Sequence, residues 1–148
     1  MTATYLAEVW QEKWQSSGFS EPSLIQEQVY PLLKAGQSVV GVSPTGSGKT
    51  LAYLLPLLET VKVGEGNQLL ILTSSQELAM QVTQVAREWA QLLDLQVLPL
   101  IGGANTKRQI EKLKTKPEVL VGTPGRVLEL IKLKKVKTQQ IHGIVLDE

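Results

Sequence analysis

The chain has 148 residues, 43% hydrophobic and 20% charged, which fits one globular domain with a sizeable core and argues against disorder. Its 15 Lys and Arg against 14 Asp and Glu leave a formal charge of +1, so any contact with nucleic acid must be local. With no cysteine there is no disulfide or thiolate metal site, the absence of a signal-peptide pattern favours a cytoplasmic location, and the longest apolar run, 51–58, is too short to span a membrane.

The first part of the chain contains three helical patterns and one strand pattern. Apolar residues at helical spacing end at Gly18 and predict a short amphipathic helix. Ser23 is placed to cap a second helix, which Gly36 ends. The β-branched run QSVVGV at 37–42 predicts a buried strand, and an apolar helix starts near Lys49. The expected buried sides of the first two helices are Leu6, Val9, Trp10 and Trp14, and Leu24, Ile25, Val29, Leu32 and Leu33.

The rest of the chain alternates strand and helix patterns. Alternation with helices of this length predicts an α/β fold, in which a mostly parallel sheet is covered by helices on both faces. We expect a turn at 64–67 and a core-facing Trp89. The predicted strands are 68–73, 96–101, 118–121 and 143–147, and the predicted helices are 75–92, 105–115 and 124–133.

The stretch SPTGSGKT, residues 43–50, has the form of a phosphate-binding loop. In such a loop backbone N–H groups surround the phosphates, the Lys ammonium reaches the terminal ones, and the following hydroxyl ligates Mg²⁺. The strict pattern has Gly where this chain has Ser43, so a plain strand-to-helix turn is the alternative. The residues expected to hold nucleotide are Thr45, Gly46, Ser47, Gly48, Lys49 and Thr50, with Lys49 also neutralising charge during catalysis and Thr50 on the metal.

An apolar run ending in two acids, GIVLDE at 143–148, closes the chain. Alone this pattern is as often a plain acidic strand end. Together with a phosphate loop upstream it predicts Asp147 as a metal ligand through water and Glu148 as general base for the attacking water.

Two further helix starts are well specified, and a helix N-terminus offers unpaired N–H groups to an anion. Ser74 and Glu77 have the spacing of a capping box. In TPGR, residues 123–126, Thr is the expected cap, Pro takes the first helical position, and Gly permits close backbone approach. Helix starts that follow parallel strands share one rim of the sheet, where ligands bind in open α/β folds.

In order and spacing, the segments from about residue 18 to residue 148 resemble the first RecA-like domain of a DEAD-box ATP-dependent RNA helicase. The resemblance implies a RecA-like P-loop domain that binds ATP and Mg²⁺, with residues 18–26 as the adenine-recognition motif, 43–50 as the phosphate loop and 145–148 as the start of the DEAD motif. It implies that Phe19 packs on adenine and that Gln26 hydrogen-bonds the adenine edge. The residues that carry it are Gly18, Phe19, Pro22, Ile25, Gln26, the phosphate loop, Glu77, Leu78, Ala79, Gln81, Gly102, Gly103, 123–126 and 145–148.

The resemblance also implies that RNA, single-stranded or duplex, binds through its backbone. Capped helix ends, a Gly pair and one Arg can recognise phosphates and hydroxyls without reading bases. The family usually has Arg where this chain has Gln76, which puts RNA affinity through that segment in question. The residues expected to contact RNA are Ser75, Gln76, Gly102, Gly103, Thr123, Pro124, Gly125 and Arg126.

The family pattern continues past Glu148 into a further strand and a second RecA-like domain with arginine fingers, so we expect residues 1–148 to be a C-terminally incomplete N-terminal domain and a poor ATPase alone. In RecA-like sheets the strand after the acidic one lies between it and the phosphate-loop strand, so we expect a gap in the sheet. The alternatives are another P-loop ATPase and a non-catalytic ATP- or RNA-binding module. Trp10 and Trp14 are expected to be a packed stripe rather than a base-stacking platform.

Overall fold

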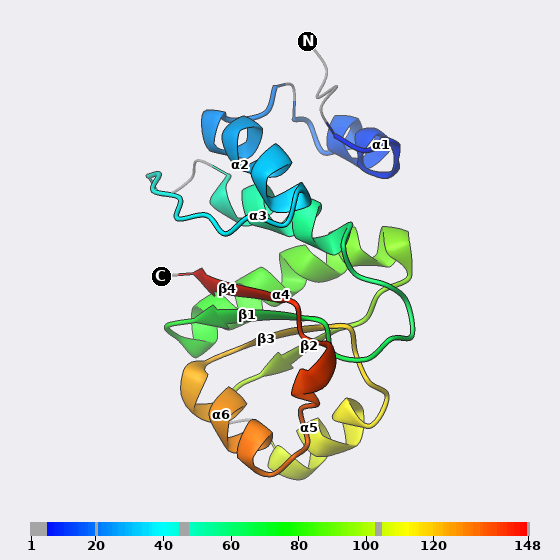
Figure 1. The fold of residues 1–148 in the computed structure, drawn as a ribbon, viewed down its shortest axis with the longest axis vertical. Helices are drawn as coiled ribbons and strands as arrows, with labels where there is room; N and C mark the ends of the chain where they lie inside the picture. The colour runs from blue at the N-terminus through cyan, green and yellow to red at the C-terminus, as the bar shows by residue number, and fades with distance from the viewer. Residues whose placement is uncertain (1–5, 20, 45–47, 103–104, 148) are drawn as a thin grey trace. The chain divides into compact units, whose positions relative to one another are not determined.

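The computed structural model describes residues 6–19, 21–44, 48–102 and 105–147, and it contains two compact units, residues 1–60 and 61–148 (Figure 1). No helix in these ranges is long and apolar enough to cross a membrane. The predicted Thr45, Gly46, Ser47, Gly103 and Glu148 lie outside the described residues.

The first unit contains three helices, α1 (Glu8–Ser16), α2 (Leu24–Lys34) and α3 (Lys49–Leu58), and all three were predicted. Ser23 caps α2 as expected, and Gly36 ends it with a φ of 84°, in the left-handed region that glycine tolerates. The predicted buried side of α2 is wrong in part. Leu24 and Leu32 are exposed, because the helix turns Gln26, Val29 and Tyr30 inward instead.

The predicted strand at 37–42 is wrong. Residues 37–44 form no strand in the described chain, and Val40 and Val42 are 94% and 90% exposed. A strand is stabilised by ladder hydrogen bonds to a neighbour and by side-chain burial, and these two valines have little burial to offer. The segment still approaches α2, since a Cβ added to Gly41 would lie 3.2 Å from Ile25 Cδ1.

Glu59, directly after α3, joins the three helices of this unit. Its Oε2 accepts hydrogen bonds from Trp10 Nε1 at 2.9 Å and from the Tyr30 hydroxyl, and its Oε1 pairs with Lys34 Nζ at 3.3 Å. The Tyr30 oxygen in turn accepts a bond from Ala7 N at 3.3 Å. The predicted packed stripe of Trp10 and Trp14 is confirmed, as the two residues are 0% and 2% exposed.

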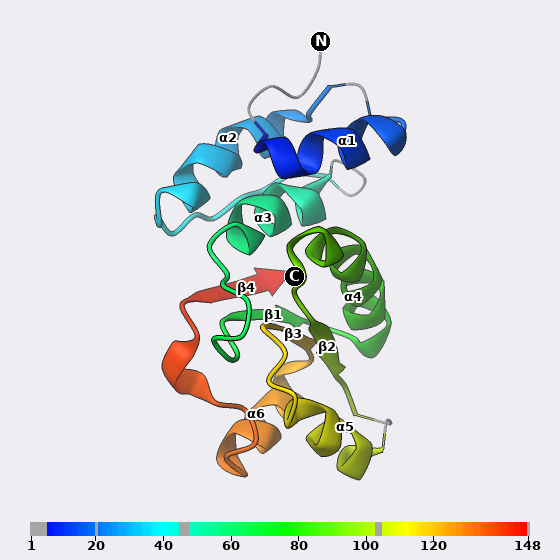
Figure 2. The same cartoon turned by 90° about the vertical axis from the view of Figure 1, so that its right-hand side faces the viewer.

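The second unit is a parallel four-stranded sheet in the order β2-β3-β1-β4. Its helices, like its strands, all match predictions to within two residues at each end. Figure 2 shows α4 on one side of the sheet and α5 and α6 on the other. The elements are β1 (Leu69–Thr73), α4 (Gln76–Ala90), β2 (Val97–Leu100), α5 (Thr106–Leu113), β3 (Val119–Gly122), α6 (Pro124–Lys132) and β4 (Gly143–Asp147), with short 3-10 turns η1 (Gln91–Leu93) and η2 (Thr138–Gln140).

The strand register separates two apolar layers. Leu70, Leu98 and Leu120 stand side by side in the ladders and join one cluster with Val127 and Leu130 of α6. The neighbouring strand residues point to the other face, which α4 covers with an apolar stripe that includes Trp89, 2% exposed as predicted. Burial on both faces explains why these strands read as continuous apolar runs.

The amino ends of the strands are held by a buried carboxylate. Glu118 is 5% exposed, and its two carboxylate oxygens accept hydrogen bonds from Gly64 N at 2.9 Å and Gln96 N at 2.8 Å. Its backbone carbonyl accepts bonds from Gln68 N and Leu69 N. These bonds fix the predicted turn at 64–67 against the amino ends of the strands. The residues of the candidate site in this unit lie at the opposite rim, where the strands end.

Candidate functional site

The phosphate-loop residues that the structure describes form the start of α3. Gly48 is the N-cap with a φ of 82°, a conformation that L side chains rarely adopt, and Lys49 and Thr50 are the first two helical residues. Both are half-exposed. The first turn of α3 therefore brings backbone N–H groups, a cation and a hydroxyl together, which is the chemistry that a polyphosphate requires.

Gln26 joins the start of α2 to the start of α3. Its Oε1 accepts a hydrogen bond from Ser23 N at 2.8 Å, which completes a capping box, and its Nε2 donates to Gly48 O at 3.2 Å. The side chain is 6% exposed, and Nε2 lies 2.4 Å from where a Cβ on Gly48 would stand. An amide offers two donors and two lone pairs, so one donor and one acceptor remain for a ligand. The adenine contact predicted for Gln26 stays a prediction.

Phe19 follows the end of α1 and is 43% exposed. Its ring packs against Trp14, with centroids 4.9 Å apart and planes tilted by 58°. An exposed aromatic ring held on one side by another ring is suited to stack against a flat ligand.

In the second unit, three loops at the carboxyl ends of β1, β2 and β3 carry the residues predicted to contact RNA. Ser75, rather than the predicted Ser74, is the N-cap of α4, since its hydroxyl accepts a hydrogen bond from Leu78 N at 3.1 Å. Thr73 Oγ1 donates to Ser75 O at 3.0 Å, which fixes the turn one residue later than the sequence pattern indicates. Gln76 lies over Gly102, where an added Cβ would stand 3.2 Å from Gln76 Nε2.

The TPGR segment starts α6 with Thr123 as N-cap and Pro124 at the first helical position, as predicted, but the Thr123 side chain makes no capping hydrogen bond. Nothing lies within 4 Å of a Cβ added to Gly125. A backbone or ligand can therefore approach the helix start closely at that point.

Arg126 is tied down rather than extended into solvent. Its Nε lies 3.1 Å from a Glu129 carboxylate oxygen, and its side chain is 12% exposed. One terminal nitrogen donates to Thr106 Oγ1 at 3.0 Å and to Gln109 Oε1 at 3.3 Å. Gln109 Nε2 donates to Ile101 O at 2.8 Å, so these bonds link the end of β2 to the start of α6.

Asp147, predicted as a metal ligand, is the last residue of β4 and pairs in register with Thr73 at the end of β1. It therefore stands at the same strand-end rim as Ser75 and Gln76. Its carboxylate is a hard oxygen donor, as is the Thr50 hydroxyl, and both suit Mg²⁺. Among the residues with described positions, no group of three or more His, Cys, Asp or Glu side chains gathers into a metal site.

One family matches all of these segments except Phe19. The model of the DEAD/DEAH box helicase family aligns with residues 23–148 of this chain. The chain belongs to the DEAD/DEAH box helicase family. Its RecA-like α/β fold, expected from the sequence, is confirmed by the parallel sheet and by the solved structures below.

Named relatives are longer than this chain. A probable ATP-dependent RNA helicase of Bacillus subtilis (strain 168), YfmL, is 52% identical over 139 residues, which are 93% of this chain and 37% of that protein. The DEAD-box ATP-dependent RNA helicase CshC of Bacillus cereus is 45% identical over 139 residues, 93% of this chain and 36% of CshC.

Two solved structures are also similar. One is a hypothetical ATP-dependent RNA helicase from Sulfolobus tokodaii, with a TM-score of 0.86 and 31% identity over 97% of this chain and 41% of that one. The other is a DEAD box protein from the hyperthermophile Methanococcus jannaschii, with a TM-score of 0.88 and 32% identity over 97% of this chain and 39% of that one. The chain thus spans about two fifths of the length of the helicases it matches.

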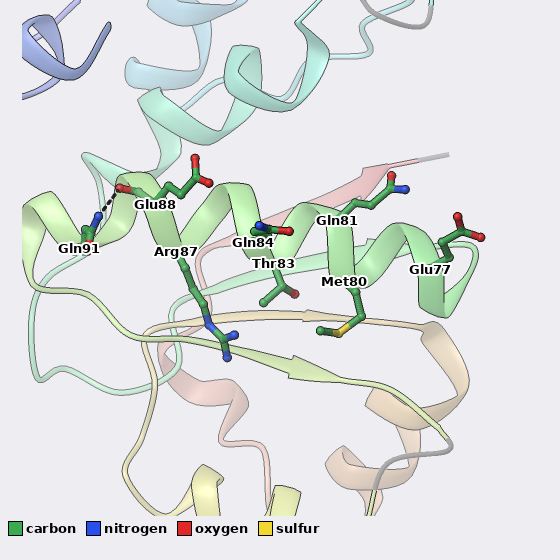
Figure 3. A pocket seen from close by; sticks show the side chains of 8 residues that line it. All are labelled: Glu77, Met80, Gln81, Thr83, Gln84, Arg87, Glu88 and Gln91. Carbon is green, nitrogen blue, oxygen red and sulfur yellow. Dashed lines mark hydrogen bonds between the residues drawn. The ribbon is translucent and has the colours of Figure 1, made fainter. Parts of the chain in front are cut away.

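A hollow runs along α4 and is lined by residues of that helix and by Gln91, the first residue of η1 (Figure 3). Its one Arg, Arg87, donates from Nε to Val97 O at 3.2 Å. Of its lining residues, Glu77 and Gln81 are among those that carry the helicase resemblance. We assign no ligand to this surface.

Sequence reasoning missed three residues that shape the site of this helicase domain. A Cβ added to Gly122 would lie 2.5 Å from Leu100 O and 2.7 Å from Val127 Cγ2, so only glycine fits directly before TPGR. Gln109 and Thr106 hold Arg126 from α5. The glycine at the end of a buried strand was a usable signal, whereas nothing in the local pattern around Gln109 distinguishes it from other polar helix residues.

Proposed function

We propose that this chain is the ATP- and RNA-binding half of a DEAD-box RNA helicase, which couples ATP hydrolysis to RNA clamping and duplex remodelling. The observation that carries the proposal is the hydrogen bond from Gln26 Nε2 to Gly48 O. The sequence assigned these two residues separately, one to adenine and one to phosphate. Their contact within the first unit supports the proposal that base recognition and phosphate binding occur at one site.

On the nucleotide side, the first turn of α3 receives the phosphates. Its N–H groups and helix dipole stabilise negative charge, and Lys49 neutralises charge that develops on the transferred phosphoryl group. Thr50 and Asp147 would hold Mg²⁺, which when bound neutralises the β- and γ-phosphate oxygens. Glu148 would take the proton from the attacking water, and Phe19 and Gln26 would orient the base.

On the RNA side, Ser75, Gln76, Gly102, Gly103 and TPGR would contact the sugar-phosphate backbone at the strand-end rim of the second unit. The capped start of α4 and the Pro-started α6 offer N–H groups to phosphates. These proposed contacts go to the backbone rather than to base edges, so binding should be independent of sequence.

The whole protein's activity also requires a second RecA-like domain in the same full-length chain, whose arginine fingers would complete the ATP site. Such fingers raise the rate of related enzymes by about 10³ to 10⁵. We therefore propose that residues 1–148 alone hydrolyse ATP poorly, and that ATP binding closes the two domains on RNA in a cytoplasmic enzyme.

The test measures RNA-stimulated phosphate release by the full-length protein and its Glu148→Gln variant. We expect the variant to bind ATP with unchanged affinity and to lose at least about a hundredfold in turnover, because general-base catalysis contributes about 10² to 10⁴. Glu65→Gln, at an exposed turn, is the matched control and should keep full activity. Full turnover in Glu148→Gln, or a wild-type protein that releases no phosphate with RNA, would contradict the proposal.

A non-catalytic ATP- or RNA-binding module is the second candidate. It is favoured by a neutral Gln76 at the rim and by an Arg126 whose guanidinium is occupied by Glu129, Thr106 and Gln109. The same experiment separates the two candidates, because a module without turnover would behave identically before and after Glu148→Gln.

A further inference from the structure

The end of α1 has the geometry of a glycine-terminated helix cap. Gly18 has a φ of 82°, and its N–H donates to Gln15 O at 3.2 Å. In such caps the residue after the glycine commonly makes an apolar contact with the residue three positions before the cap residue. Here those two residues are Phe19 and Trp14, whose ring centroids are 4.9 Å apart.

The two rings differ in how firmly they are held. Trp14 is 2% exposed and belongs to the core of the first unit, whereas Phe19 is 43% exposed. The planes are tilted by 58°, an arrangement in which aromatic pairs attract beyond the area they bury. The buried ring therefore determines where the exposed ring stands.

The indole N–H of Trp14 plays no visible part in this contact. Among the described residues, Trp14 Nε1 is the one buried side-chain nitrogen or oxygen without a hydrogen-bond partner. An unsatisfied buried donor destabilises the fold. What Trp14 supplies to Phe19 is thus its ring, and a phenylalanine ring at the same position should supply a similar surface.

We propose that Trp14 is a positioning residue for the base of the bound nucleotide, acting through the Phe19 ring. This inference rests on the proposed function, since it requires that Phe19 packs on the base. Because Trp14 would act through its contact with Phe19, its effect should be confined to ligands that carry a base.

The test measures binding of ADP and of inorganic tripolyphosphate, each with Mg²⁺, to the full-length protein by calorimetry. Trp14→Leu should raise the Kd for ADP about fivefold to tenfold, the equivalent of a lost aromatic pair, and leave the Kd for tripolyphosphate unchanged. Trp14→Phe should keep the Kd for ADP within about twofold of wild type. In a Phe19→Leu background, Trp14→Leu should have no further effect on ADP, because the ring through which it acts is gone.

Tyr30→Phe is the control for general destabilisation, since it removes the Glu59 bond in the same unit without touching Phe19. An equal loss for both ligands in Trp14→Leu, or an undiminished loss in the Phe19→Leu background, would overturn the inference and assign Trp14 a purely structural role. If Trp14→Leu does not fold, Gly18→Ala loosens the same cap while keeping both rings. The inference then requires that Gly18→Ala raise the Kd for ADP and leave the Kd for tripolyphosphate unchanged. A wild-type protein that binds neither ligand would instead refute the proposed function.

Discussion

The two units of the molecule differ in whether a β-branched run is buried. In the second unit Val119 and Val121 lie in a strand with a neighbour on each side, and both are 0% exposed. In the first unit Val40 and Val42 lie in an equally β-branched run and are 94% and 90% exposed. The difference teaches that a strand sequence becomes a strand only where another backbone satisfies its N–H and C=O groups.

The two units are also stabilised by different kinds of contact. The sheet unit relies on ladders and on two apolar layers, with Glu118 closing one rim. The helical unit relies on side chains, with Glu59 receiving Trp10, Tyr30 and Lys34. The two units should therefore respond to different substitutions, and they should unfold separately when one of them is weakened.

The largest expected effect is on the hydrogen exchange of residues 37–42, when a neighbouring strand is available to pair with them. We predict that in the natural full-length protein residues 37–42 become a strand, paired with a strand that follows Glu148. Their amide protons should then exchange about a thousandfold more slowly than in residues 1–148, because exchange would require opening of a ladder. Hydrogen exchange with mass spectrometry measures this, with 69–73 as the internal reference that stays protected in both. Equal exchange of 37–42 in the two proteins would contradict the prediction.

Glu59→Leu should produce the next largest effect, on the first unit alone. The substitution removes the carboxylate to which the Trp10 indole and the Tyr30 hydroxyl donate. A hydrogen bond to a charged group contributes about 1.5 to 3 kcal/mol, so we expect a loss of about 3 kcal/mol. Chemical denaturation followed by hydrogen exchange measures the loss and its location. Lys34→Met removes only the partner with a 56% exposed side chain and should cost under about 1 kcal/mol. A uniform loss of protection in both units would show that they do not unfold separately.

Gly122→Ala should destabilise the second unit by about 2 kcal/mol, since the new methyl group would meet Leu100 O at 2.5 Å and backbone cannot move aside cheaply. Gly125→Ala is the matched control, because open space surrounds its Cβ position, and it should change stability by less than about 0.5 kcal/mol. Thermal unfolding of both variants measures the difference. Equal midpoints would mean that the end of β3 yields more readily than its close contacts indicate.

The second unit was predictable from sequence because its periodicity reports burial on both faces of each element. All four of its strands and its three helices follow from apolar runs, turn residues and caps. The failures depend on contacts that the apolar pattern does not report, one with a residue distant in sequence and one within a tight turn. Gln26 is buried because Gly48 accepts its amide, and Ser75 replaces Ser74 as cap because Thr73 binds its carbonyl. The adenine, metal and RNA contacts of the site residues remain predictions.

The smallest expected effect is that of Gln76→Arg on RNA binding. It would test the difference between Gln76, which is uncharged, and Arg126, whose charge is engaged by neighbouring side chains. Gln76 is exposed at the start of α4, whereas Arg126 is occupied by three polar neighbours. A free guanidinium at 76 should add one phosphate contact, which for single-stranded RNA steepens the dependence of log K on log salt concentration by about 0.7. Affinity at about 0.1 M salt should rise a few-fold.

The control is Gln84→Arg, which adds the same charge to an exposed position of α4 more than two turns farther from its start. A change in salt dependence confined to Gln76→Arg means that the added cation meets a phosphate at the rim, because a nonspecific increase in net charge acts equally from both positions. An identical slope in the two variants would place bound RNA away from the start of α4. Since Arg126 is occupied, RNA binding would then have to rest on the remaining TPGR residues and on Gly102 and Gly103.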